Sequence, residues 1–173
     1  MFATIYLPNF YLQAALRHQP ELAEKPVAII DGQEAKAVII QLNRAAEEAG
    51  VRRGMTPSQG LARYLQLIVK TRLRDQEELL GEMLLQFAWT LAPYVEATAP
   101  GICTVQFTEN RHVRRNVQRV VEQLRDANIT AQGGIAQTPE TSFLAAYLAK
   151  PVLHVGDTKD FLAPLPLETL AIG

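Results

Sequence analysis

The stretch PVAIIDGQEAKAVIIQL, residues 26–42, decides the fold class of this chain. It contains two runs rich in β-branched residues, 26–30 and 37–42, and a turn signal at Asp31-Gly32 lies between them. Two strands joined by a segment this short are typical of an antiparallel hairpin. Because strands elsewhere in the chain alternate with helices, a hairpin here predicts an α+β fold rather than a doubly wound parallel sheet.

Apolar periodicity and capping signals define the elements around this hairpin. Residues 56–59, Thr-Pro-Ser-Gln, form a capping box with proline at the first helical position. Leu80, Leu84, Phe87 and Leu91 share one face of a long helix. The expected strands lie at 2–7, 26–30, 37–42, 67–70, 102–107 and within 129–136, and the expected helices at 10–18, 44–49, 57–64, 75–92, 111–126 and 138–149.

Composition excludes several classes of protein. Of the 173 residues, 48% are hydrophobic and 20% are charged, with a net charge of −1, which excludes a disordered chain. No apolar run is long enough to span a membrane, and the N-terminus lacks the basic region of a signal peptide. The single cysteine, Cys103, cannot form an internal disulfide, so we expect a cytoplasmic protein. The three histidines and this cysteine have no metal-ligand spacing, so we expect no zinc site. We also expect no other metal and no cofactor.

The charge is unevenly distributed along the chain. Seven basic residues lie in the segment 44–74, against only two acidic residues, Glu47 and Glu48. One interpretation is that the arginines are the solvated faces of two helices. The other is a surface that contacts the phosphate backbone of DNA, since arginine can hold phosphate in a bidentate fork. The residues expected on such a surface are Arg52, Arg53, Arg63, Lys70 and Arg72.

Single motifs for catalysis are weak. Ser58 lies inside the capping box and Cys103 lies within an apolar strand, so both are interpreted as structural residues. Gly133-Gly134 leads into a helix, but it lacks the further glycines and the lysine of a phosphate-binding loop. An unrelated small α+β ligand-binding domain, with this glycine pair as its site, is therefore one alternative.

The order of several short blocks carries more information than any one of them. These are Phe10-Tyr11, residues 26–30, the run GVRRGM at 50–55, Val95-Glu96, and GIA at 134–136 with the following helix. In this order they resemble the palm and fingers of Y-family (translesion) DNA polymerases. The resemblance implies that residues 1–173 form a ferredoxin-like palm, a mostly antiparallel sheet with the helices 75–92 and 111–126 on one face. It also implies a small helical fingers subdomain at about 43–72, with the thumb and little finger absent.

The chain departs from this family at the metal-binding positions. In the family, an Asp at the end of the first strand and an Asp-Glu pair at the start of the strand after the long helix hold two metal ions. In register, these positions fall on Tyr6, Gly101 and Ile102. The departure does not depend on the register, because the first acidic residue is Glu21 and the segment 97–108 contains no carboxylate. These strands therefore have no ligand to offer to magnesium.

The positions that contact the nucleotide triphosphate in the family are also changed. The family's Tyr and Arg before the GVRRGM block fall on Arg44 and Glu47, and its lysine in the last helix falls on Phe143. A carboxylate at Glu47 would repel an anion. We therefore expect neither nucleotide binding nor enzymatic activity.

Consistent loss of this kind is similar to the catalytically inactive, ImuB-type subgroup of the family. Members of this subgroup are adaptors in damage-induced (SOS) translesion DNA synthesis and mutagenesis. The resemblance implies a sliding clamp, a RecA-like accessory protein and an error-prone C-family polymerase as partners, with no membrane contact. It implies DNA binding that is weak or depends on a C-terminal region outside this chain. An active translesion polymerase fragment with displaced metal ligands is the remaining alternative.

Overall fold

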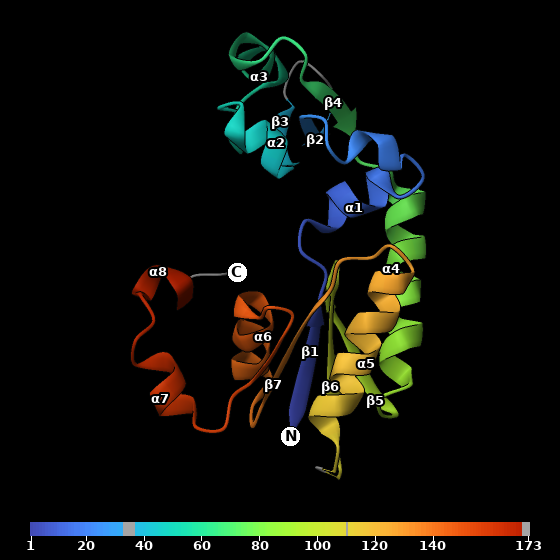
Figure 1. Ribbon diagram of the computed structural model, residues 1–173, viewed down its shortest axis with the longest axis vertical. Coiled ribbons are helices and arrows are strands. Elements are labelled where there is room, and N and C mark those ends of the chain that lie inside the picture. Colours follow the sequence, from blue (N-terminus) through green and yellow to red (C-terminus); the bar gives the residue numbers. More distant parts are fainter. Residues whose placement is uncertain (33–36, 110, 171–173) are drawn as a thin grey trace. The chain divides into compact units, whose positions relative to one another are not determined.

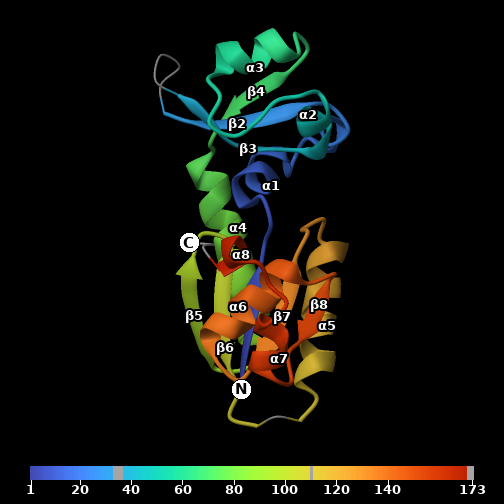
Figure 2. The same cartoon turned by 90° about the vertical axis from the view of Figure 1, so that its left-hand side faces the viewer.

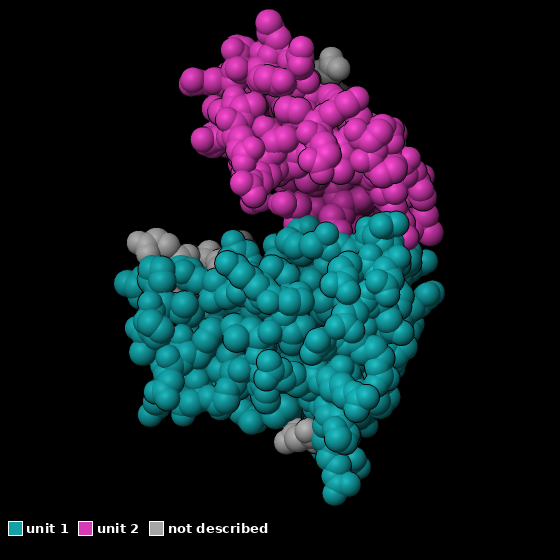
Figure 3. Space-filling view, viewed as in Figure 1, with its two compact units in different colours: residues 1–8, 81–173 teal, residues 9–80 magenta. Residues whose placement is uncertain are grey.

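The structure, a computed structural model, describes residues 1–32, 37–109 and 111–170. The chain divides into two compact units (Figure 3). Unit 1 consists of residues 1–8 and 81–173, and unit 2 of residues 9–80. One boundary follows Pro8 and the other falls within helix α4 (Arg74–Trp89). Each unit contains a β-sheet of its own.

The hairpin of residues 26–42 forms the centre of unit 2. Strand β2 (Val27–Asp31) pairs antiparallel with β3 (Val38–Leu42) and parallel with β4 (Ile68–Thr71), giving the order β3-β2-β4. The antiparallel pairing confirms the prediction from the sequence. Residues 33–36, in the predicted turn, lie outside the described residues.

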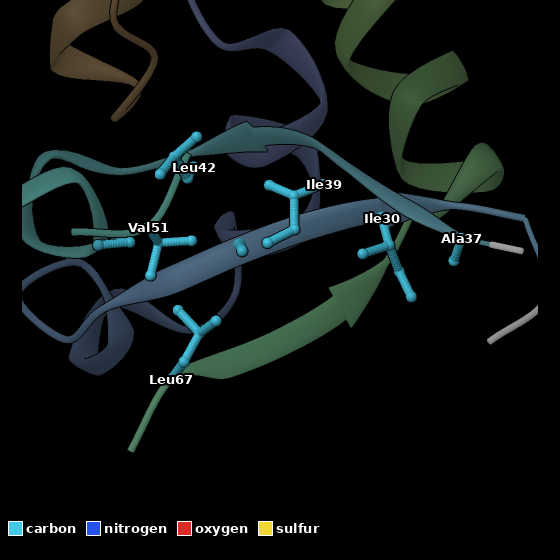
Figure 4. Close-up of a cluster of buried hydrophobic side chains, with 8 residues drawn as sticks. Ile30, Ala37, Ile39, Leu42, Val51 and Leu67 are labelled. Carbon is cyan, nitrogen blue, oxygen red and sulfur yellow. The ribbon is translucent and has the colours of Figure 1, made fainter. Parts of the chain in front are cut away.

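Short helices pack with this sheet: α1 (Phe10–Leu16), α2 (Arg44–Glu48) and α3 (Pro57–Arg63). The predicted capping box of α3 is present, because Gln59 N donates to Thr56 Oγ1 and Thr56 N donates to Gln59 Oε1. Beneath the helices, a cluster of buried side chains joins the strands (Figure 4). Its members are Ala28, Ile30, Ala37, Ile39, Leu42, Ala46, Val51 and Leu67.

Unit 1 is built on a five-stranded sheet with the order β5-β6-β1-β7-β8. All neighbouring strands are antiparallel except β7 and β8, as expected for a mostly antiparallel sheet. The edge strands β5 and β8 are not predicted from the sequence, because β5 is largely exposed and β8 is only 3 residues long. The strands are β1 (Phe2–Tyr6), β5 (Tyr94–Ala99), β6 (Ile102–Gln106), β7 (Gln132–Ala136) and β8 (Val152–His154).

Helices cover both faces of this sheet (Figures 1 and 2). Helix α5 (Val113–Asp126) and the part of α4 that belongs to unit 1 lie on one face, and α6 (Pro139–Leu148) lies on the other. Two short helices, α7 (Thr158–Leu162) and α8 (Leu167–Leu170), follow β8. The expected α+β fold, with two long helices on one face of the sheet, is confirmed.

Both helix layers approach β7 at a pair of glycines. A Cβ atom at Gly133 would lie 2.7 Å from Val117 Cγ1 of α5. A Cβ atom at Gly134, on the opposite face, would lie 2.1 Å from the backbone atoms Ala146 N and Ser142 O of α6. Helix α6 therefore packs backbone against backbone on β7, and only glycine at position 134 leaves room for it.

Cys103 lies in the core of unit 1 and is fully buried as a free thiol. Burial raises the pKa of this thiol to about 12, because the thiolate would lose its hydration. The interpretation of Cys103 as a core residue is confirmed. None of the helices within the described residues is both long and apolar enough to cross a lipid bilayer.

The glycine contacts predict opposite effects for two alanine substitutions. Gly134→Ala should lower the free energy of unfolding by about 3 kcal/mol or more, because the new methyl group would overlap backbone that cannot rotate away. Gly81→Ala, in helix α4, has open space around it and should raise stability by about 0.5–1 kcal/mol. Urea denaturation of both variants measures the difference. A Gly134→Ala variant as stable as the parent chain would contradict the close approach of α6.

Candidate functional site

The three positions on which the family's metal ligands fall, Tyr6, Gly101 and Ile102, lie together in unit 1, where β1 ends and β6 begins. Tyr6 is paired with Ile102 in the antiparallel register. Beside them, Leu7 N donates to Gly101 O at 2.8 Å. Gly101 has φ 74°, in the left-handed region that favours glycine. The fold therefore brings the predicted positions together, and the turn before β6 requires a backbone conformation that suits glycine.

The side chains at these strand ends form an aromatic cluster with α6. The Tyr6 ring contacts Phe143 edge to face, with centroids 6.5 Å apart, and Tyr147, with centroids 5.8 Å apart. Phe143 stands where the resemblance places the family's nucleotide-contacting lysine, whereas Tyr147 is not among the positions singled out from the sequence. A signal for Tyr147 exists in its spacing from Phe143, since residues four apart share a helix face. Phenol, hydrogen and alkyl groups are poor ligands for a hard cation. Within the described ranges, no group of three His, Cys, Asp or Glu residues is placed to hold a metal ion.

A network of hydroxyl groups lies on the same face of the sheet. Ser142 donates to Pro139 O at 2.7 Å, which leaves its oxygen free to accept from Thr4 at 2.7 Å. Thr4 also lies 3.4 Å from Thr104, and Thr104 lies 2.9 Å from Thr98. Thr4 and Ser142 are fully buried, so these bonds satisfy groups that would otherwise be costly to bury. No sequence pattern predicts this network, because its members come from different elements.

A hollow of about 660 Å³ opens beside this network in unit 1. Its wall combines threonine hydroxyls with apolar side chains of α6 and with two carboxylates, Glu96 and Glu140. No basic side chain is among the described residues that line it. Its lining residues are Glu96, Thr98, Thr104, Pro139, Glu140, Thr141, Phe143, Leu144, Leu162 and Thr169.

Arg44 and Glu47, which stand where the family's other two nucleotide-contacting residues fall, lie on α2 in unit 2. Arg44 Nε donates to Glu48 Oε1 at 2.7 Å, an ion pair between residues four apart on the helix. The Arg44 side chain is 88% exposed, so this pair contributes little to stability. Glu47 is exposed. Helix α2 thus presents charges of both signs to solvent.

Most residues of the predicted DNA surface are exposed, and two are held by local hydrogen bonds. Arg52 Nη1 donates to the backbone oxygens of Glu47 and Val51, at 2.6 and 2.7 Å. Arg53 Nη2 donates to Asn9 Oδ1 at 3.1 Å. Arg63 is exposed in the last turn of α3, and Lys70 is half-buried on β4. These bonds leave other donors of Arg52 and Arg53 available to a ligand.

Arg72 is the exception among the predicted DNA contacts. Its guanidinium donates to both Glu77 carboxylate oxygens, at 2.9 and 2.6 Å, and to Asp31 Oδ2 at 2.8 Å. It also lies over the Tyr11 ring, 4.0 Å from the centroid. The hydrogen bond to Glu77 raises the pKa of Arg72 above its usual range. With its charge balanced by two carboxylates, Arg72 stabilises unit 2 and has little left to offer to phosphate.

Comparison with known proteins gives one family and a group of relatives. A family model described as IMS, the impB/mucB/samB family, matches residues 5–147. A curated protein named DNA polymerase IV from Pseudomonas syringae pv. tomato is 27% identical over 171 residues, and one from Legionella pneumophila (strain Paris) is 25% identical over 170 residues. Each alignment covers 93% of this chain and 48% of the relative. The chain thus spans about half the length of the curated relatives it matches.

Solved structures share the fold. One titled "Insertion ternary complex of Dbh DNA polymerase" superposes with a TM-score of 0.86 at 17% identity, over 99% of this chain and 54% of that one. The crystal structure of DinB from Sulfolobus solfataricus gives a TM-score of 0.81, also at 17% identity, over 99% of this chain and 53% of that one. At this identity the likeness establishes the polymerase-like fold alone.

These relatives correct one expectation from the sequence. The absence of carboxylates at Tyr6, Gly101 and Ile102 predicts a protein that is not an enzyme. That expectation is wrong, because the curated relatives that align with nearly the whole chain are named DNA polymerase IV, and polymerases are enzymes. The reason is that the sequence-based expectation concerned only a few positions. Missing ligands at two strand ends describe those positions only, and the chain spans about half the length of the curated relatives whose names carry the activity.

The ion pairs of Arg72 predict a role in stability that a nearby arginine does not share. Arg72→Gln should lower the free energy of unfolding by about 2 kcal/mol, because it leaves the buried Glu77 carboxylate without its charged partner. Arg74→Gln, at an exposed position two residues away, should change stability by less than about 0.5 kcal/mol. Thermal and urea denaturation measure both. Equal stability of the two variants would show that the Arg72 cluster contributes nothing.

Proposed function

This chain belongs to the impB/mucB/samB family, and from that membership we propose that it takes part in translesion DNA synthesis as part of a Y-family polymerase-related protein. The names of the curated relatives and the polymerase-like fold support this proposal. Unit 1, with its five-stranded sheet and two long helices, is the palm. Unit 2, which includes the segment 43–72, is the fingers.

The chemistry at the strand ends supports a more specific role. In place of metal ligands, Tyr6 packs against Phe143 and Tyr147, and Ile102 lies beside it. This aromatic cluster is the observation that carries the proposal. We infer that these positions do not hold a metal pair and that the chain contributes through contacts, as an adaptor of the ImuB type in damage-induced (SOS) mutagenesis. The partners of such an adaptor are a sliding clamp, a RecA-like accessory protein and an error-prone C-family polymerase.

A second candidate function is nucleotidyl transfer itself. It is favoured by the name DNA polymerase IV, which the curated relatives carry. The metal ligands would then have to come from other positions than Tyr6, Gly101 and Ile102. Primer extension by the natural full-length protein, with magnesium or manganese, distinguishes the two candidates.

Both candidates require contact with DNA, and we propose that exposed basic side chains of unit 2 make this contact. Arg52, Arg53, Arg63 and Lys70 provide positive charge from the loop before α3, from α3 itself and from β4. Such contacts release counterions from DNA and do not read the base sequence. Arg72 stabilises the same unit through its ion pairs with Asp31 and Glu77.

The DNA contact predicts a weaker salt dependence in a double variant. Arg52→Gln/Arg53→Gln should weaken binding of a fluorescent DNA duplex and reduce the slope of log affinity against log salt by about 2, since each neutralised phosphate contributes about 0.9. The control Arg17→Gln/Lys25→Gln removes the same charge elsewhere in unit 2 and should leave the slope unchanged. Fluorescence anisotropy between about 50 and 200 mM salt measures both. Equal slopes for the two variants would remove this surface from the proposal.

The aromatic cluster predicts how the strand ends respond to a paramagnetic cation. Manganese, added with nucleotide and primer–template, should not selectively broaden the amide NMR signals of Tyr6, Gly101 and Ile102, because no oxygen anion of the strand ends can coordinate it. The exposed carboxylates of α2 serve as an internal reference for weak, non-specific broadening. Selective broadening at the three strand-end positions, together with primer extension, would contradict the adaptor proposal and support the second candidate.

A further inference from the structure

Helix α5 carries a row of arginines that the proposed function does not use. One side of the helix is buried against the sheet of unit 1 through Val113, Val117, Val120, Val121 and Leu124. Its other side presents Arg114, Arg115 and Arg119 to solvent, and Arg111 lies in the turn before the helix. At 3.6 residues per turn, the three helical arginines fall within an arc of about 140°. We call these four residues the α5 arginine face.

The arginines of this face have no ion-pair partner among the described residues, although Glu122 lies within the same arc of the helix. Among the described residues, none forms an ion pair or a side-chain hydrogen bond with any of the four guanidinium groups. The nearest acidic residue along the helix, Glu122, accepts a hydrogen bond from Gln118. Apart from Arg125, the other basic residues of unit 1 are Lys150 and Lys159, which lie outside α5. Most of the positive charge of unit 1 is therefore concentrated on one helix and the turn before it.

This concentration of positive charge destabilises helix α5. The first turn of α5 contains no acidic residue, although Arg114 and Arg115 lie there, where the helix dipole disfavours positive charge. Arg115 and Arg119 are four residues apart, a spacing at which like charges repel. Sequences that break such local rules without a compensating contact tend to do so at functional surfaces. The arrangement favours an external anion as the missing partner.

A small hollow adjoins the row and adds neutral donors to it. It has a volume of about 180 Å³ and lies between α5 and the segment that follows α4. Arg119 lines it together with the amide side chains of Asn116 and Gln123, and no carboxylate is among its described lining residues. Amide N–H groups beside a guanidinium are typical donors to phosphate and sugar oxygens. The full lining is Thr90, Leu91, Asn116, Arg119, Val120 and Gln123.

From these observations we propose that the α5 arginine face is a second nucleic-acid contact, which binds the phosphate backbone of single-stranded DNA without reading its sequence. Arginine rather than lysine makes up the whole row, and its planar fork matches phosphate bidentately. The arginines are spread around about 140° of the helix surface and along about 7.5 Å of its length, which suits an extended polyanion better than a single small ion. The choice of DNA over an acidic protein rests on the proposed function in translesion synthesis.

The test removes three charges from this face and compares the result with a charge-matched control. The triple variant is Arg114→Gln/Arg115→Gln/Arg119→Gln, and the control is Lys25→Gln/Lys150→Gln/Lys159→Gln, which removes the same charge outside α5; all six residues are exposed. Anisotropy of a fluorescent oligothymidylate is measured between about 50 and 200 mM salt. The triple variant should reduce the slope of log affinity against log salt by about 2, since each neutralised phosphate of a single strand contributes about 0.7, and the control should not. Circular dichroism checks that both variants are folded.

Three outcomes would overturn the proposal. If the slope of log affinity against log salt decreased equally in the triple variant and its control, net charge alone would explain the effect. Unchanged DNA binding in the triple variant, with loss of binding to a polyglutamate probe, would assign the face to an acidic protein instead. Absence of measurable binding to the oligonucleotide by the parent chain at about 50 mM salt would overturn it as well. The Arg52→Gln/Arg53→Gln variant, measured in parallel, separates this proposal from the proposed surface of unit 2, since each can fail while the other holds.

Discussion

Helix α6 lies so close to strand β7 that no side chain fits between them at Gly134, and the arrangement of unit 1 depends on this contact. A Cβ atom there would lie 2.1 Å from the helix backbone. Because Gly134 has no Cβ atom, the backbone of α6 can pack directly against the sheet. That position allows Ser142 to meet Thr4 and brings Phe143 over Tyr6. On the other face, Gly133 leaves room for the side chain of Val117 from α5. One strand without side chains at its centre thus sets the position of both helix layers.

The same contact between α6 and β7 determines which side chains surround Tyr6 at the end of β1. With α6 this close, two further aromatic rings pack beside Tyr6. The buried hydroxyls of Thr4 and Ser142 satisfy each other on the same face of the sheet. At the strand ends where the resemblance places the family's metal ligands, this chain therefore has an aromatic cluster beside hydroxyl groups that bond to each other. The positive charge lies elsewhere, on exposed loops of unit 2 and on α5.

Much of the fold could be predicted because short segments of the sequence determine it. The hairpin at 26–42, the capping box at Thr56 and the long helices α4 and α5 all follow from neighbouring residues. Strands β5 and β8 could not be predicted, since an exposed or 3-residue edge strand carries no apolar alternation and is defined by its partner. Asn9 lies at the N-terminus of α1, yet its side chain makes no capping bond and accepts instead from Arg53.

The sequence alone determined which local elements form and which chemical groups are available: no acid in the first 20 residues or in the segment 97–108, one cysteine, and arginine-rich segments. Only the tertiary structure decided which of these groups meet. It paired Arg72 with Asp31 and Glu77, and it joined Tyr6 to rings on a helix far along the chain. The physical reason is that helices and turns are stabilised by residues a few positions apart. Contacts between distant residues depend on how closely two backbones can approach, which here is set by Gly134.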